Sequence, residues 1–136
     1  MTMEERLRLA EEKRAEGYNC CQAVILACRE LCGLPEEAAC AGYCFGGGMQ
    51  CGSVCGAVTG GLMSLGAAMP KREPNDNRPL AKTAALELEE RFQQKFGTLL
   101  CSEIVRDHGK RICGDCVAFC VENTADMIEK MNKGEL

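Results

Sequence analysis

Twelve cysteines in 136 residues are the side chains of this sequence with the greatest capacity for chemistry. A cysteine thiolate attacks disulfides and binds metal ions. At this density an exported chain would carry a disulfide scaffold, whereas a chain in a reducing compartment would use its thiols for redox chemistry or metal binding. Free cysteine can also serve as a small core residue. The cysteines are Cys20, Cys21, Cys28, Cys32, Cys40, Cys44, Cys51, Cys55, Cys101, Cys113, Cys116 and Cys120.

Helix-capping signals precede four of these cysteines. Asn19 precedes Cys20, and a Gly-Ser pair lies just ahead of Cys55. A Gly-Thr pair lies ahead of Cys101, and a Gly-Asp pair directly precedes Cys116. We predict that each cysteine lies in the first turn of a helix, where free N–H groups and the helix dipole favour the thiolate. If the four helix starts converge, they form an electropositive pocket with four sulfur ligands, which suits an anionic iron–sulfur cluster or a tetrahedral zinc ion.

The same segments resemble a known family. Cys55-Gly56-Ala57-Val58-Thr59-Gly60 reads Cys-Gly-Ala-x-x-Gly and follows the glycine-rich stretch Phe45-Gly46-Gly47-Gly48-Met49. Gly17-Tyr18-Asn19-Cys20 lies upstream, and Phe96-Gly97-Thr98-Leu99-Leu100-Cys101 lies downstream, followed by a late cysteine before a C-terminal helix. In this order, over about residues 5–132, these elements resemble the redox-active protein family labelled by its cysteine pattern, C_GCAxxG_C_C.

The resemblance implies four signature cysteines, which map to Cys20, Cys55, Cys101 and Cys116. Cys113 and Cys120 are the neighbouring alternatives for the last position. The resemblance also implies a redox role, and a related cysteine-bearing domain fused to a multihaem cytochrome with an iron–sulfur centre favours a cluster.

Our main functional hypothesis is a metal centre for electron transfer. We expect Cys20, Cys55, Cys101 and Cys116 to bind the metal, and Gly56 and Gly60 to lie beside the cofactor. An iron–sulfur cluster is the expected cofactor, with zinc as the lesser alternative. If the protein is an enzyme, we expect a thiol- or metal-dependent oxidoreductase.

The alternative hypothesis is a thiol–disulfide enzyme or redox sensor without metal. Cys113-Gly114-Asp115-Cys116 is a Cys-x2-Cys sequence, and we expect Cys55 and Cys116 to be the catalytic thiols. No strand–helix–strand pattern surrounds this sequence, which argues against a thioredoxin-like setting. A third hypothesis is a helical interaction protein whose cysteines only fill the core.

Other cysteines and the single histidine have simpler expected roles. Cys28 and Cys32 lie on an apolar helix face and should pack in the core. Cys40, Cys44 and Cys51, with Cys113 and Cys120, leave a second or larger centre open. His108 lies near a predicted helix end, where we expect it to be exposed.

The elements that must position these residues are all predicted to be helical. No alternation of period two extends beyond four residues, which argues against strands. We therefore expect an all-α fold, a compact single-domain bundle of about six or seven helices with short glycine-rich loops, over residues 1–136. The predicted helices are 3–16, 20–33, 35–44, 53–69, 80–96, 99–107 and 116–132, and the polar segment 70–79 is predicted to be an exposed loop.

Glycines recur within the helix predicted at 53–69, at Gly56, Gly60, Gly61 and Gly66. Each should destabilise a helix by about 1 kcal/mol relative to alanine. Small residues four positions apart give a flat face that another backbone or an inorganic centre can approach. The sequence leaves both readings open.

The net charge and the hydropathy of the chain argue against nucleic acid and membranes as partners. A net charge of −4 gives no basic surface for nucleic acid. No apolar run is long enough for membrane insertion, and a chain charged from Glu4 onward lacks a secretory signal. We expect a cytoplasmic protein with an unidentified redox partner protein, and a homodimer is left open.

Overall fold

The computed structural model describes residues 1–136 and contains only helices and their connections. The helices are α1 (Met3–Ala15), α2 (Cys20–Cys32), the 3-10 helix η1 (Glu36–Phe45), α3 (Gly56–Ala67), α4 (Pro74–Phe96), α5 (Cys101–His108) and α6 (Ile112–Asn132). A short irregular turn, η2 (Gly48–Gly52), connects η1 to α3. The only strand-like pairing is an isolated bridge between Val54 and Leu100. The all-α prediction is confirmed.

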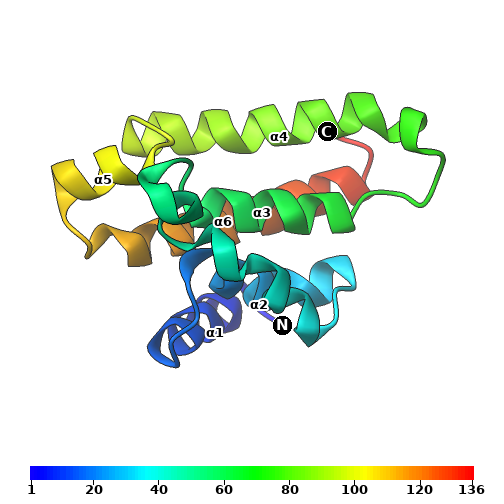
Figure 1. The fold of residues 1–136 in the computed structure, drawn as a ribbon. Helices are drawn as coiled ribbons and strands as arrows, with labels where there is room; N and C mark the ends of the chain where they lie inside the picture. Colours follow the sequence, from blue (N-terminus) through cyan, green and yellow to red (C-terminus); the bar gives the residue numbers. More distant parts are fainter.

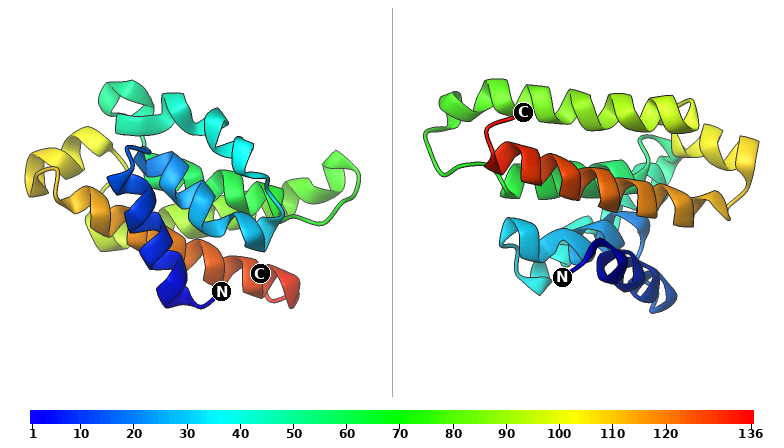
Figure 2. Two further views of the ribbon diagram at one scale, coloured as in Figure 1. Left: turned by 90° about the horizontal axis from the view of Figure 1, so that it is seen from below. Right: turned by 180° about the vertical axis from the view of Figure 1, so that it is seen from behind.

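The helices pack in layers around α3 and α6 (Figures 1 and 2). α4 covers one side of this central pair, and α1 and α2 cover the other. α5 lies at one end of the bundle, near the starts of α3 and α6. This layering gathers several helix N-termini at the end of the molecule that α5 occupies.

The α2 boundaries follow the predicted capping residues. The Asn19 side chain accepts a hydrogen bond from the Gln22 N–H at 2.9 Å, and the Gln22 side chain accepts one from the Asn19 N–H at 3.1 Å. This reciprocal box satisfies two N–H groups that a helix start leaves unpaired. The Asn19 amide also donates to the carbonyls of Gly42 and Tyr43, both at 3.1 Å, and so ties η1 to the start of α2. Gly33 ends α2 in the left-handed conformation, with φ +71°.

Residues 74–79 are helical, so the predicted loop at 70–79 is too long. Pro74 occupies the first position of α4, where a missing N–H is tolerated. Pro79 lies inside the helix, where it has no N–H to donate to the carbonyl four residues earlier. The side-chain amide of Asn77 also donates to the Pro70 carbonyl at 2.9 Å and fixes the connection from α3. α4 therefore begins at Pro74, whereas the prolines of segment 70–79 had predicted a start at residue 80.

Two helix starts near the C-terminal half also differ from prediction. α6 begins at Ile112, so Asp115 lies inside the helix and does not cap it. A turn after Gly109 starts this helix early, since the Cys113 N–H donates to the Lys110 carbonyl at 3.1 Å. α5 begins at Cys101 with Leu100 as its N-cap residue, and Thr98 instead accepts a hydrogen bond from the Leu100 N–H.

The core has two parts. The larger cluster joins α1, α2, α3 and α6 and includes Phe92 of α4, whose ring packs against those of Phe96 and Phe119 at centroid distances of 4.6 and 6.0 Å. The smaller cluster lies between α3, α4 and α6 and contains Leu65, Ala84, Leu88, Met127 and Ile128. None of the helices combines the length and the apolar character that crossing a bilayer requires.

Candidate functional site

Five cysteines line one small cavity at the end of the bundle near α5. They are Cys20, Cys55, Cys101, Cys113 and Cys116, and the remaining lining residues are Gly47, Gly56, Ile104, Val105 and Ile112. We call this the thiol cavity. Its volume of about 50 Å³ is far below the roughly 300 Å³ at which small-molecule pockets begin. It suits sulfur chemistry or a small inorganic group better than an organic cofactor.

The cavity cysteines come from the N-terminal ends of four helices. Cys20 is the first residue of α2 and Cys101 is the first residue of α5. Cys55 is the N-cap residue immediately before α3. Cys113 is the second residue of α6, and Cys116 follows one turn later. The four helix dipoles therefore present their positive ends toward this part of the molecule.

The structure brings together all four cysteines singled out in the sequence, but not all in the positions predicted. Cys20 and Cys101 lie in first helical turns, as predicted. Cys55 precedes its helix, and Cys116 lies beyond the first turn because α6 begins at Ile112. Cys113 occupies the first-turn place predicted for Cys116. The Cys113-x2-Cys116 spacing was the sequence signal for this fifth thiol.

A pair of extended segments holds Cys55 beside Cys101. The Cys55 N–H donates to the Leu99 carbonyl at 2.8 Å, and the Cys101 N–H donates to the Ser53 carbonyl at 2.7 Å. These two hydrogen bonds flank the Val54–Leu100 bridge. Because the pairing extends the backbone through Val54, α3 begins after Cys55 rather than at Ser53.

Glycines let the backbone approach closely around the cavity. A Cβ atom on Gly56 would lie 2.9 Å from the Phe45 carbonyl oxygen and 3.3 Å from the Cys21 nitrogen. A Cβ atom on Gly48 would lie 2.8 Å from the Cys101 Cβ. Larger residues at either position would push these segments apart.

The turn beside the cavity is strained. Gly47 and Gly48 have φ angles of +62° and +65°, and Met49 and Gln50 continue with +59° and +62°. A left-handed conformation destabilises a residue other than glycine by about 1–2 kcal/mol. Strain of this kind is common beside functional sites. Here it occurs at Met49 and Gln50, two and three residues after Gly47, which lines the thiol cavity.

The pKa values of Cys55 and Cys116 depend on each other. The Cys116 thiol is the largest cause that lowers the pKa of Cys55, to about 7. The Ala57 and Val58 amides lower it further, while burial opposes them. The same interaction with Cys55, together with burial, raises the pKa of Cys116 well above its usual range. At neutral pH, Cys55 is partly ionised and Cys116 is protonated.

Two other cavity thiols, Cys20 and Cys101, have raised pKa values and favour the protonated form. Burial raises the pKa of Cys20 to about 12, and repulsion from Cys113 and Cys55 adds to this. Burial also raises the pKa of Cys101, again with repulsion from Cys55. The predicted lowering at helix starts is therefore wrong for Cys20, Cys101 and Cys116, because burial and neighbouring thiolates outweigh the helix dipole. A cation in the cavity would relieve that repulsion.

The remaining predicted site residues lie away from the cavity. Gly60 packs against α2, where its Cβ would meet the Cys21 carbonyl oxygen at 2.6 Å. Cys28 is fully buried in the core, as predicted, whereas Cys32 is half-buried and its S–H donates to the Cys28 carbonyl at 3.2 Å. His108 is exposed at the end of α5, as predicted.

Three further cysteines, Cys40, Cys44 and Cys51, are exposed, and none of them lines the thiol cavity. The structure contains no group of three or more His, Cys, Asp and Glu side chains arranged to hold a metal ion. The metal-binding roles of Cys20, Cys55, Cys101 and Cys116, and the cofactor-binding roles of Gly56 and Gly60, stay predictions.

Comparison with known proteins gives one match. A family model described as "Putative redox-active protein (C_GCAxxG_C_C)" matches residues 18–131. This range contains all five cysteines of the thiol cavity, and the resemblance noted in the sequence is confirmed. No curated protein and no solved structure matches the chain.

Proposed function

The chain belongs to the C_GCAxxG_C_C family of redox-active proteins, and on that basis we propose that the thiol cavity binds an iron–sulfur cluster that carries electrons. The observation behind this proposal is that five thiols from four helix N-termini line one cavity. A dithiol mechanism uses two or three thiols, whereas a cluster commonly uses four. Cluster binding therefore accounts for more of the cavity.

The donor set fits a cluster chemically. Thiolates are the usual cluster ligands, and the positive ends of helix dipoles stabilise the net negative charge of such a centre. Cys20, Cys55 and Cys101 would supply three ligands, and Cys116 or its neighbour Cys113 the fourth. The bound cluster would supply one-electron transfer.

Zinc is the weaker candidate. A single zinc ion needs four ligands close around one point, with Zn–S distances of about 2.3 Å. No three ligand side chains are arranged in this way, so the thiols would have to move together. Zinc also has no redox chemistry, which suits a redox-active family poorly.

Metal analysis of protein purified without oxygen tests the proposal. We expect iron and acid-labile sulfide to be bound, with visible absorption that bleaches on reduction. Cys20→Ser and Cys101→Ser should lose most of the iron, because each removes a ligand. Cys40→Ser is the matched control at an exposed cysteine and should retain it. Protein that stays colourless and iron-free after reconstitution with iron and sulfide would overturn the proposal.

A second candidate function, thiol–disulfide exchange, is favoured by the presence of Cys55 and Cys116 in one cavity and by the lowered pKa of Cys55. The Cys55 thiolate would attack a disulfide, form a mixed disulfide and release one substrate thiolate. Cys116, after losing its proton, would attack the Cys55 sulfur and release the second substrate thiolate. The substrate gains two electrons, and the protein is left with a Cys55–Cys116 disulfide.

Mass spectrometry after mild oxidation of the metal-free protein tests this second function. A reversible disulfide between Cys55 and Cys116 is the expected product. Because Cys116→Ser cannot form it, Cys55 in that variant should instead accumulate as a mixed disulfide or sulfenic acid. Cys55 and Cys116 thiols that both resist oxidation would rule the exchange mechanism out.

The setting of this activity is also a proposal. A reducing compartment such as the cytoplasm would keep the twelve thiols free, and an electron carrier requires a redox partner protein. A homodimer would appear in analytical ultracentrifugation as a species of twice the 14.7 kDa chain mass.

A further inference from the structure

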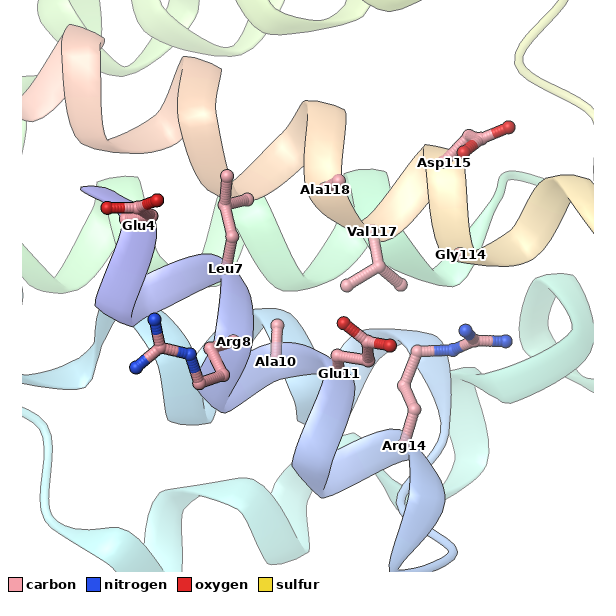
Figure 3. A pocket seen from close by; sticks show the side chains of 10 residues that line it. All are labelled: Glu4, Leu7, Arg8, Ala10, Glu11, Arg14, Gly114, Asp115, Val117 and Ala118. Carbon is pink, nitrogen blue, oxygen red and sulfur yellow. The ribbon is translucent and has the colours of Figure 1, made fainter.

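Arg14 reaches from α1 to the first turn of α6. Its Nη1 atom lies 3.1 Å from the position that a Cβ atom on Gly114 would occupy. Figure 3 shows the guanidinium extending across the groove between the two helices toward Gly114. Glycine at position 114 lets the guanidinium lie this close, because a side chain there would crowd it.

This contact brings a positive charge next to the thiol cavity. Gly114 directly follows Cys113, which lines the cavity from α6. The charge of Arg14 also lowers the pKa of Cys20, on the neighbouring start of α2. No other arginine or lysine contributes to the shifted pKa of any cavity cysteine.

The charge of Arg14 is not committed to an ion pair. None of the eight ion pairs in the structure includes this residue. The same groove is lined by three carboxylates and a second arginine, namely Glu4, Glu11, Asp115 and Arg8. Arg14 is half-buried, and at such a site solvent screens a charge less than at the open surface.

We propose that Arg14 is a positioning residue for the thiol cavity, whose fixed charge beside Cys113 makes the cavity favour anionic reactants over neutral ones. The inference rests on the proposed function only in taking the cavity thiols as the reactive groups. It names a class of reactant, an anion, and assigns the preference to one side chain outside the cysteine set.

Two alkylating reagents of similar size and different charge test this inference. Iodoacetate is an anion and iodoacetamide is neutral. The ratio of their rates at Cys20 and Cys113 in the reduced, metal-free full chain reports the local potential, because the nucleophilicity of each thiol cancels. We expect Arg14→Gln to lower this ratio several-fold and high salt to lower it in the wild type.

Matched variants separate charge from structure. Arg14→Lys retains the charge and should retain the ratio, and Arg8→Gln removes the other arginine of the groove and should leave the ratio unchanged.

Alkylation of the buried Cys28 reports any unfolding. If Arg14→Gln exposes Cys28, Arg14→Met, which keeps more of the apolar stem, replaces it. The inference would be overturned if the folded Arg14→Gln or Arg14→Met variant kept the wild-type ratio of iodoacetate to iodoacetamide rates. It would also be overturned if Arg8→Gln lowered this ratio equally. Because the assay uses no metal, its result is independent of whether a cluster binds.

Discussion

At the scale of single residues, the cavity contains two thiols with opposite protonation. Cys55 and Cys116 are both buried, yet their interaction holds the pKa of Cys55 near 7 and raises that of Cys116. This asymmetry makes Cys55 the expected nucleophile in exchange chemistry. It also makes Cys55 the expected first ligand to bind a metal, because metals bind the thiolate.

Removing the Cys116 thiol should make Cys55 less reactive at neutral pH. In the wild-type protein we expect the alkylation rate of Cys55 to rise with pH with a midpoint near 7. Cys116→Ala should move that midpoint upward and slow alkylation at pH 7 several-fold, because the Cys55 thiolate loses its interaction with the Cys116 thiol. Alkylation rates measured by mass spectrometry from pH 5 to 10 give both values.

Cys116→Ser is the matched variant, since its hydroxyl is also a donor group facing Cys55. It should retain most of the lowered pKa. An equal upward shift in the serine and alanine variants would mean that the cavity as a whole, rather than a donor at position 116, sets the pKa of Cys55.

At the scale of the elements, glycines in α3 determine how closely α2 and α3 approach. The sequence left two readings open for these glycines, close packing or a neighbouring inorganic centre. Gly60 packs against the backbone of α2. Gly56 packs near Cys20 and Cys21 and also lines the thiol cavity. Close packing of α3 on α2 therefore helps to bring Cys20 and Cys55 to one site.

Gly60→Ala should destabilise the protein by about 1–3 kcal/mol, in the range for overpacked cores. The added Cβ would lie 2.6 Å from the Cys21 carbonyl oxygen, and backbone cannot rotate aside. Gly66→Ala lies in the same helix with no atom within 4 Å of the added carbon, and it should stabilise by about 0.5–1 kcal/mol. Urea unfolding curves measure both. A Gly60→Ala variant as stable as Gly66→Ala would contradict the observed packing.

Asn19→Ala should loosen the start of α2 and with it Cys20. The change removes the capping hydrogen bond and both contacts to η1, at a cost of about 1–2 kcal/mol. We also expect faster alkylation of Cys20. Thr2→Ala removes the equivalent cap of α1 and should destabilise without affecting Cys20. Equal Cys20 alkylation rates in the two variants would contradict this role for Asn19.

The sequence was informative where local chemistry decides the structure. Asn19 and Gly33 predicted both ends of α2, because capping depends on neighbours in sequence. The start of α3 could not be predicted, because Val54 pairs with Leu100, which is distant in sequence. The gathering of four cysteines was a hypothesis from helix dipoles, whereas their pKa values depend on burial and mutual repulsion that only the tertiary structure reveals.

At the scale of the whole molecule, folding buries several thiols in protonated form. Burial raises the pKa of Cys28 to about 12, and that of Cys120 well above its usual range. An unfolded cysteine loses its proton near pH 9. The folded chain therefore retains protons that the unfolded chain releases above that pH, and its stability must fall as pH rises from 9 toward 12.

The reduced, metal-free protein should consequently lose stability in alkali. For Cys28 alone, the shift from 9 to about 12 predicts a loss of about 2 kcal/mol between pH 9 and pH 11. Cys28→Ala should be less stable at pH 8, because it leaves a cavity, but should lose less stability between these two pH values. Urea unfolding at pH 8, 9, 10 and 11 tests this, and equal slopes in the two proteins would contradict it.

The claim that one cavity gathers the functional thiols is tested most directly by cysteine footprinting during cluster reconstitution. The reduced chain is titrated with iron and sulfide without oxygen, and the alkylation of each cysteine is followed by mass spectrometry. We predict that Cys20, Cys55, Cys101 and at least one of Cys113 and Cys116 lose reactivity together, in proportion to bound iron. The exposed Cys40, Cys44 and Cys51 should stay reactive. Protection of these exposed cysteines instead, or protection of the cavity cysteines independently of one another, would contradict the account.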